Sequence, residues 1–135
     1  MKERKLLLVV FCLFTLLAMA QGKGKDYVEV LYFHGKQRCK TCIAIEKYAK
    51  EVVAEDFAKE QKNGRVVFKV VDISTSDGER IAKSYRVTWS SLYVNGWKKG
   101  KETRKDMTAF AFKNARSDTD KFKKGVSATI RKLLK

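Results

Sequence analysis

Two cysteines separated by two residues, Cys39 and Cys42, lie where a strand-like segment gives way to a helix-like one. Residues 27–33, before the pair, are dense in β-branched and aromatic side chains, which is typical of a strand. After the pair, apolar residues recur on one helical face: Ile45, Tyr48, Ala49, Val52, Val53 and Phe57. This placement favours a fold that presents two thiols at the N-terminus of a helix.

The rest of the chain alternates between strand and helix patterns. Residues 65–73 form a nearly continuous apolar run, as expected of a parallel strand covered on both faces. The capping-box spacing at 76–79 predicts the start of a short helix. Residues 91–97 and 101–106, joined by a basic turn, predict a β-hairpin. A final amphipathic helix is predicted to begin within 117–120.

The order β-α-β-α-β-β-α predicts one α/β domain over residues 27–135, with a central mixed β-sheet flanked by helices. A strand, a crossover helix and a second strand imply a right-handed parallel unit, to which the hairpin adds antiparallel edge strands. Asn63 and Gly64 are expected to end the first helix, and residues 110–112 are expected to lie in a loop. This order matches the minimal thioredoxin fold.

Residues 1–20 have the layout of a secretory signal peptide: a basic start, an apolar run and a small-x-small tripeptide that ends at Ala20. The apolar run is shorter than the ~20 residues of a membrane-spanning helix, so the alternative of a retained anchor is the weaker interpretation. We expect cleavage before Gln21, a flexible lead-in over 21–26, and export to the periplasm or outside the cell without stable membrane insertion. Cleavage removes Cys12 and leaves Cys39 and Cys42 in an oxidising compartment.

The setting of the cysteine pair predicts a nucleophilic first thiol. A thiolate at a helix N-terminus is stabilised by unpaired N–H groups and the helix dipole, so the pKa of Cys39 should fall below its usual value of about 8.5. Lys36, Arg38 and Lys40 add positive charge nearby. Cys42, one turn into the helix, is placed to resolve a mixed disulfide. The sequence therefore predicts Cys39 as the attacking thiol and Cys42 as the resolving thiol of a thiol-disulfide oxidoreductase or electron-transfer protein.

Two other functions fit the same residues. Cu(I) and arsenite accept two or three soft ligands, so a metal or metalloid carrier using Cys39 and Cys42 is the alternative from another class. His34 is the only histidine, and it is either a modulator or ligand of the site or a polar residue at a strand end. Two cysteines and one histidine fall short of a four-ligand structural zinc site. The third possible function is that of a binding module in which the disulfide only stabilises a turn.

The charge balance bears on partners rather than on fold. Thirty basic residues against fifteen acidic ones give a formal charge of +15, which steers the protein toward anionic surfaces and partners. No nucleic-acid-binding signature and no flavin or nicotinamide fingerprint is found, so we expect no nucleic acid and no cofactor. The expected partner is a protein disulfide or dithiol.

Several short motifs resemble the thioredoxin-like superfamily. They resemble more closely a family of small exported bacterial thioredoxin-fold proteins, some of which are named nitrophenyl compound nitroreductase subunit. The motifs lie at residues 32–35, 38–42, 89–92 and 110–116, and the resemblance covers 27–135. It implies a redox-active disulfide that serves a protein partner or a partner reductase.

The chain departs from typical thioredoxins at three places. Lys40 and Thr41 replace Gly-Pro between the cysteines, Tyr32 stands roughly where the buried aspartate is expected, and Ser90-Ser91 stands where cis-Pro-Thr is expected. Proline is absent from the whole chain. Because a non-proline cis bond costs about 2.5 to 4 kcal/mol, the Trp89–Ser90 peptide is predicted to be trans. We hypothesise that the hydroxyls of Ser90 and Ser91 approach the sulfurs and lower the pKa of Cys39.

Overall fold

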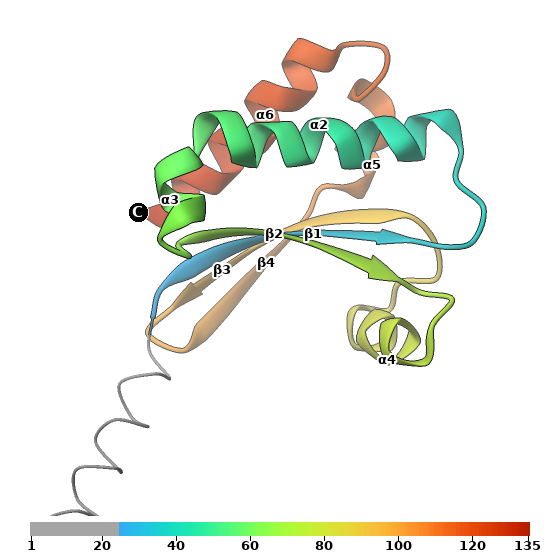
Figure 1. Cartoon of the computed structure of the whole chain (residues 1–135), viewed down its shortest axis with the longest axis horizontal. Helices are drawn as coiled ribbons and strands as arrows, with labels where there is room; N and C mark the ends of the chain where they lie inside the picture. The colour runs from blue at the N-terminus through green and yellow to red at the C-terminus, as the bar shows by residue number, and fades with distance from the viewer. Residues whose placement is uncertain (1–24) are drawn as a thin grey trace, which may run out of the picture.

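Four strands form one mixed sheet in the computed structural model, which describes residues 25–135 (Figure 1). The strands are β1 (Tyr27–His34), β2 (Val66–Asp72), β3 (Ser91–Lys98) and β4 (Lys101–Asp106). Their order across the sheet is β2-β1-β3-β4. β1 pairs parallel with β2 and antiparallel with β3, and β3 pairs antiparallel with β4. The predicted parallel unit and hairpin are thereby confirmed.

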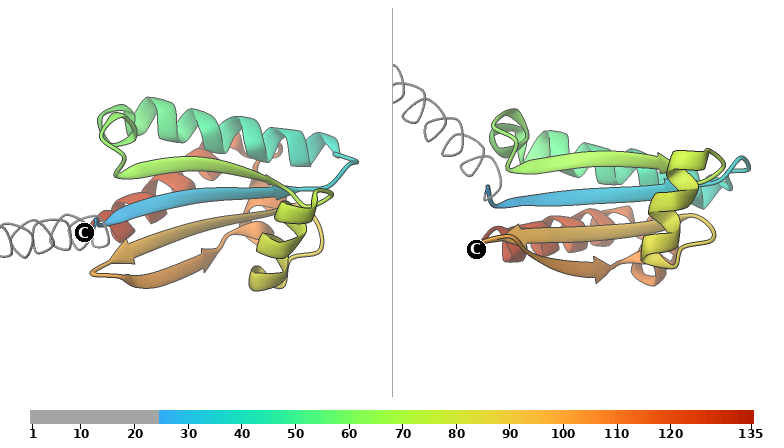
Figure 2. Two further views of the ribbon diagram at one scale, coloured as in Figure 1. Left: turned by 60° about the horizontal axis from the view of Figure 1, so that its bottom comes forward. Right: turned by 90° about the horizontal axis from the view of Figure 1, so that it is seen from below.

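Helices lie on both faces of this sheet. They are α2 (Lys40–Asp56), α3 (Ala58–Lys62), α4 (Ser76–Tyr85), α5 (Thr108–Asn114) and α6 (Thr119–Leu134). Helices α2, α5 and α6 cover one face, whereas α4 crosses one end of the opposite face (Figure 2). The strand order and the crossover through α2 make this an α/β, thioredoxin-like fold in a single domain, as predicted.

The core has two parts because the sheet is covered on both faces. Side chains that alternate along β1 point to opposite faces of the sheet, so Tyr32 belongs to one part and Phe33 to the other. The smaller part, under α4, consists of Leu31, Phe33, Val71, Ala82 and Val87. The larger part, under α2, α5 and α6, consists of Val28, Val30, Tyr32, Ile45, Ala49, Val52, Val53, Phe57, Val66, Leu92, Val94, Ala111, Ala115, Phe122, Val126 and Ile130.

Three predicted helix boundaries differ from the structure. The helix after the cysteines is broken at Phe57, whose buried ring stands between α2 and α3. The side chain of Thr75, not Ser76, caps α4 by accepting a hydrogen bond from the Gly78 amide. The predicted loop over residues 110–112 is wrong, because this segment lies inside α5, where Ala111 is buried. The predicted start of the last helix is confirmed by the cap at Asp118.

The prediction that the apolar second strand is covered on both faces is wrong. β2 is an edge strand, and its Val67 and Val70 are 37% and 40% exposed. The prediction that both hairpin strands are edge strands is also wrong, because β3 pairs on both sides and only β4 lies at the edge. The basic turn itself is confirmed: Lys99 and Gly100 have φ values of 52° and 78°, as a two-residue hairpin turn requires.

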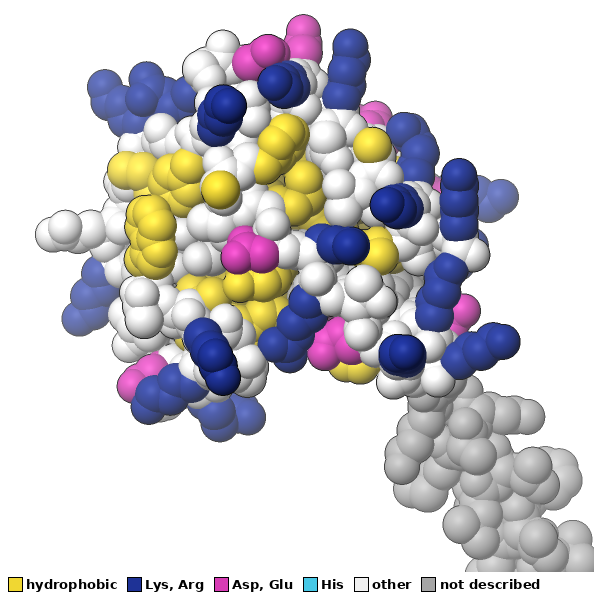
Figure 3. All heavy atoms as spheres, turned by 180° about the vertical axis from the view of Figure 1, so that it is seen from behind, with side chains coloured by type: hydrophobic (Ala, Val, Ile, Leu, Met, Phe, Trp, Pro, Cys, Tyr) yellow, Lys and Arg dark blue, Asp and Glu magenta, His cyan; other side chains and the backbone are white. Residues whose placement is uncertain are grey.

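Charged side chains dominate the rim of the molecule. On the face shown in Figure 3, Lys and Arg side chains project around the whole outline, and acidic side chains are interspersed among them. β4 contributes to this surface along its length, since five of its six residues are exposed. Apolar side chains gather in patches nearer the centre of the same face.

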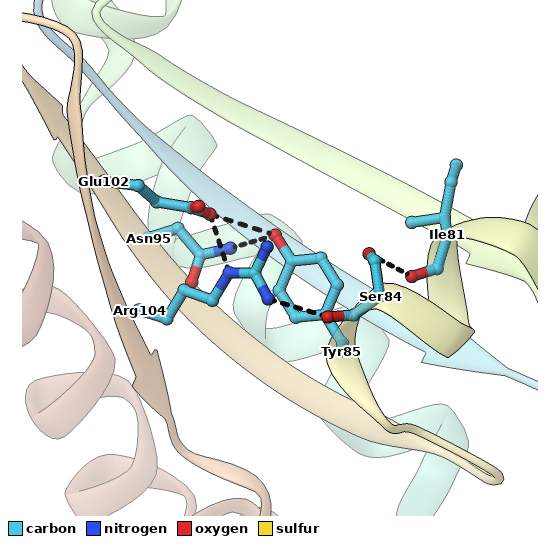
Figure 4. A network of polar contacts seen from close by, with 6 residues as sticks. All are labelled: Ile81, Ser84, Tyr85, Asn95, Glu102 and Arg104. Atoms are coloured by element: carbon cyan, nitrogen blue, oxygen red, sulfur yellow. Dashed lines mark hydrogen bonds and ion pairs between the residues drawn. The ribbon is translucent and has the colours of Figure 1, made fainter.

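A polar network ties the C-terminal end of α4 to the hairpin (Figure 4). The hydroxyl of Tyr85 accepts a hydrogen bond from Asn95 Nδ2 at 2.9 Å and donates to Glu102 Oε1 at 3.5 Å. The guanidinium of Arg104 lies 3.7 Å above the centre of the Tyr85 ring and donates to the carbonyl of Ser84 at 3.0 Å. These contacts anchor the segment that leads from α4 into β3.

The predicted signal peptide, residues 1–20, lies outside the described residues, as does most of the predicted lead-in. Export therefore stays a prediction. Within residues 25–135, no helix is both long and apolar enough to cross a membrane.

Candidate functional site

The cysteine pair occupies the junction between β1 and α2. Cys39 and Cys42 form a disulfide with their Cα atoms 5.0 Å apart. Cys39 is the N-cap of α2, and its Sγ accepts a hydrogen bond from the amide of Cys42 at 3.0 Å. Cys39 is exposed, whereas Cys42 is only 5% exposed. The two sulfurs therefore differ in access: an incoming molecule meets Cys39 first.

Tyr32 lies beneath the second cysteine. Its ring is fully buried, and its hydroxyl donates a hydrogen bond to the carbonyl of Cys42 at 2.9 Å. Burial raises the pKa of Tyr32, and a hydrogen bond with the Ser90 side chain partly offsets that rise. The group under Cys42 is therefore a neutral hydrogen-bond donor, not a carboxylate that can take a proton.

A chain of hydrogen bonds runs beside the cysteines from the end of β1 to α2. Arg38 donates through Nη2 to His34 Nε2 at 2.6 Å and through Nη1 to Glu46 Oε2 at 2.9 Å. Because Nε2 of His34 accepts, Nδ1 carries the proton and donates to the carbonyl of Gly35 at 2.9 Å. His34 is 7% exposed, so this hydrogen-bond chain starts inside the protein and reaches the surface at Arg38 and Glu46.

Asp72 brings a further charge to the end of the sheet. It is the cross-strand partner of His34 in the β1–β2 register. Hydrogen bonds from the hydroxyl and amide of Ser74 hold the pKa of Asp72 below its usual value, and the charge of Arg38 acts in the same direction. The site thus contains two carboxylates, Asp72 and Glu46, on either side of the His34–Arg38 pair.

Two exposed apolar side chains are neighbours in sequence of residues of the site. Ile43, which follows Cys42 in α2, is 51% exposed, and Trp89, which precedes Ser90, is 60% exposed. The Trp89 ring stacks on Phe112 of α5 with the ring centres 5.1 Å apart. Exposed large hydrophobic side chains are rare among the described residues, and these two lie next to residues of the site. Such a surface suits contact with another protein.

The remaining predicted site residues take different positions. Lys40 is the first residue of α2 and is exposed beside Cys39. Ser90 is buried next to Tyr32, whereas the hydroxyl of Ser91 donates to the carbonyl of Trp89 at 3.1 Å. The Trp89–Ser90 peptide is trans, as predicted. The structure thus brings Ser90 to the buried side of the pair and engages the Ser91 hydroxyl locally.

Sequence reasoning missed Glu46. The basic residues Lys36, Arg38 and Lys40 are singled out by the sequence, whereas no acidic residue of the helix is. A signal was present, since Glu46 follows Cys42 by four residues and Cys39 by seven. Residues at these spacings share one face of a helix, so the carboxylate belongs on the same side of α2 as both cysteines.

The arrangement is suited to thiol-disulfide exchange. It offers an accessible sulfur at a helix N-terminus, a second sulfur that is shielded from solvent, and no carboxylate directly under the pair. In the described part of the chain, no three His, Cys, Asp or Glu side chains gather as metal ligands. The ring nitrogens of His34 are already bound to Gly35 and Arg38.

Comparisons with known proteins give only distant likenesses. No family model matches the sequence, and no curated protein matches it. Among solved structures, a thioredoxin from Thermus thermophilus is similar at 20% identity and a TM-score of 0.48, over 85% of this chain and 79% of that chain. A malarial protein is similar at 22% identity and a TM-score of 0.41, over 73% of this chain and 96% of that chain. Neither likeness assigns a role to any residue here.

Proposed function

We propose that this protein is an exported thiol-disulfide exchange protein in which Cys39 attacks and Cys42 resolves. The observation that carries the proposal is the asymmetry of the pair: an exposed Cys39 at the N-cap of α2 and a Cys42 that is 5% exposed. A helix N-terminus favours the thiolate form, which is the nucleophile in disulfide exchange.

The number of disulfide bonds and the number of electrons are unchanged over the exchange. In the dithiol form, the Cys39 thiolate attacks one sulfur of the partner's disulfide, forms a mixed disulfide and releases the other partner sulfur as a thiolate, which takes a proton from water. The Cys42 thiol then loses its proton to solvent and attacks Cys39, which regenerates the Cys39–Cys42 disulfide and frees the second partner thiolate. The reverse sequence transfers a disulfide to a partner dithiol.

The surface around Cys39 supports a protein as the partner. Ile43 and Trp89, which adjoin Cys42 and Ser90 in the sequence, are both more than half exposed. The stacking of Trp89 on Phe112 gives a flat aromatic surface at the residue that precedes Ser90. A polypeptide can cover such a surface, whereas a small disulfide would leave most of it in contact with water.

A turnover assay and a trapping experiment test the proposal together. The purified protein should accelerate the reduction of insulin disulfides by dithiothreitol. Cys42→Ser should accumulate mixed disulfides with envelope proteins through Cys39, because the resolving thiol is gone. Cys39→Ser is the matched control and should trap none. No acceleration together with equal trapping by the two variants would contradict the proposal.

The carrier of Cu(I) or arsenite remains the alternative for the same two sulfurs. No observation on the described residues favours it, since His34 is held by Arg38 and no third ligand accompanies the cysteines. Native mass spectrometry of the reduced protein with Cu(I) or arsenite tests it. A tight stoichiometric complex without insulin reduction would support the carrier.

Export and family membership are supported by the sequence alone. Residues 1–20 carry the signal-peptide layout, and the mass of the protein recovered from the cell envelope should correspond to a chain that begins at Gln21. The resemblance to nitroreductase subunits rests on short motifs, and co-purification with a partner reductase would support it. A recovered mass that includes Cys12 would contradict cleavage.

A further inference from the structure

The ion pair between Arg38 and Glu46 lies beside both cysteines. Glu46 is four residues after Cys42 and seven after Cys39, so it lies on the helix face that carries the pair. Arg38 directly precedes Cys39, and its Nη1 reaches Glu46 Oε2 at 2.9 Å. The Arg38 side chain therefore runs along the first turns of α2, on the side of the cysteines.

Both ends of the Arg38 guanidinium are held. Nη1 donates to Glu46, and Nη2 donates to His34 at 2.6 Å. His34 is 7% exposed, and its other ring nitrogen is bound to the Gly35 carbonyl, so it provides a fixed anchor at the end of β1. The Arg38 and Glu46 side chains are 32% and 24% exposed, so water screens their charges only in part.

We propose that the Arg38–Glu46 pair sets the ionisation of the Cys39 thiol in the reduced protein, with Arg38 favouring the thiolate and Glu46 opposing it. The proposal rests on the proposed function and names Glu46 as a positioning residue that acts partly through Arg38. The two opposite charges nearly cancel at the sulfur while both are present. Loss of one charge leaves the other uncompensated. Removing Arg38 and removing Glu46 therefore shift the pKa of the Cys39 thiol in opposite directions.

Single and double substitutions test this sign reversal. The Cys39 thiol is titrated by its thiolate absorbance and by alkylation rate against pH, in Cys42→Ser protein so that one thiol is observed. Arg38→Gln should raise the Cys39 pKa and Glu46→Gln should lower it, each by ~0.5 to 1 unit, which is a change of ~3- to 10-fold in thiolate fraction at low pH. The double variant should return close to the starting value.

Two further variants separate charge from structure. Arg38→Lys keeps the charge but loses the two-ended hydrogen bonding, so its pKa should lie between those of the parent and Arg38→Gln. Glu51 lies farther along α2 than Glu46, and its carboxylate pairs with Lys123 at 2.7 Å. Its side chain is about as exposed as that of Glu46, so Glu51→Gln is a matched control. It should leave the Cys39 pKa unchanged.

The outcomes distinguish this inference from the proposed function. Shifts of the same sign in Arg38→Gln and Glu46→Gln, or no shift in either, would overturn the role of the pair, whatever the insulin assay shows. Opposite shifts in a protein that neither reduces insulin nor traps partners would support the inference and contradict the function. If a variant unfolds, the pKa difference between Arg38→Lys and the parent still carries the test.

Discussion

The group beneath Cys42 determines how the second thiol loses its proton. Tyr32 places a phenol there, and burial raises its pKa, so the hydroxyl stays protonated at neutral pH. Its hydrogen bond to the Cys42 carbonyl fixes the first turn of α2 against β1. At the scale of single residues, Tyr32 is therefore a structural support of the site and does not place a carboxylate beneath Cys42.

Tyr32→Phe should weaken the fold without removing exchange activity. The substitution deletes the buried hydrogen bonds with the Cys42 carbonyl and the Ser90 side chain, and we expect the free energy of unfolding to fall by about 1 to 2 kcal/mol in urea titrations. Tyr27→Phe is the matched control, because the Tyr27 ring stacks on Trp97 and its hydroxyl makes no hydrogen bond among the described residues. Loss of insulin reduction in Tyr32→Phe at unchanged stability would show that the phenol takes part in the chemistry.

At the scale of elements, local patterns predicted most of the helices and strands, the parallel unit and the hairpin, but not which strands lie at the edges of the sheet. The runs at 27–33 and 91–97 predicted β1 and β3, because β-branched and aromatic residues mark strands wherever these pair. The edge position of β2 was not predictable, since a continuous apolar run also fits a central strand. α5 was missed because a helix of seven residues is too short to show a clear period.

The residues of the candidate site also divide into those that the local sequence predicts and those that depend on the fold. Cys39 and Cys42 were predictable as a pair because their spacing and the strand-helix junction are local features. Glu46 depended on the exact helical register, and Trp89 depended on the packing of α5, which brings Phe112 from a distant part of the chain. The helical spacing of Glu46 from the cysteines is a local signal, but the stacking of Trp89 on Phe112 follows from the fold and has none.

The close contact between α4 and the end of β2 predicts that a substitution at Gly78 strongly destabilises the protein. A Cβ atom built on Gly78 would lie 1.8 Å from the backbone oxygen of Asp72, which cannot move without distorting β2. Although alanine favours a helix over glycine, Gly78→Ala should lower the free energy of unfolding by about 3 kcal/mol in denaturant titrations.

Gly125→Ala provides the comparison for Gly78. Its Cβ would meet the Phe110 ring, whose Cζ lies 2.3 Å away and which can rotate outward because Phe110 is only partly buried. We therefore expect a smaller loss of stability, of about 1 kcal/mol. An equal or larger loss at Gly125 would show that the α5–α6 contact is tighter than that between α4 and β2.

The polar network around Tyr85 predicts that the stability of the protein depends on pH under alkaline conditions. Burial raises the pKa of Tyr85 to about 12, while Arg104 lowers it and Glu102 raises it. A raised pKa means that the folded state holds the proton more tightly, so this contribution to stability is complete below pH 10 and is lost as the pH rises from about 10 through 12. Phenolate absorbance should show a late-titrating fraction that decreases by one tyrosine in Tyr85→Phe.

The stability of Tyr85→Phe supplies the control for that prediction. Between pH 10 and 12, the parent should lose more free energy of unfolding than the variant, because the parent carries the phenol of Tyr85 in addition to the other tyrosines with raised pKa values. Identical pH profiles for the two proteins would mean that Tyr85 ionises without disturbing the network in Figure 4.

At the scale of the whole molecule, the excess of positive charge acts on encounter rather than on chemistry. The chain carries thirty basic and fifteen acidic residues, and basic side chains project around the outline of the molecule (Figure 3). Lys36 and Lys40, beside Cys39, are exposed and form no ion pair within the described residues. We therefore expect an anionic partner to be attracted toward the accessible sulfur.

Exchange rates should therefore depend on salt in a way set by the charge of the partner. The second-order rate constant with a disulfide peptide flanked by aspartates should fall at least 10-fold between about 10 mM and 500 mM salt, because screening shortens the range of attraction from about 30 Å to a few ångströms. A peptide flanked by lysines should react more slowly and gain from added salt, and a neutral small disulfide should be nearly unaffected. Because Cys39 performs the same step with all three, a difference in salt dependence reports on encounter alone. Parallel salt dependence for the acidic and basic peptides would show that the positive surface plays no part in bringing partners to the site.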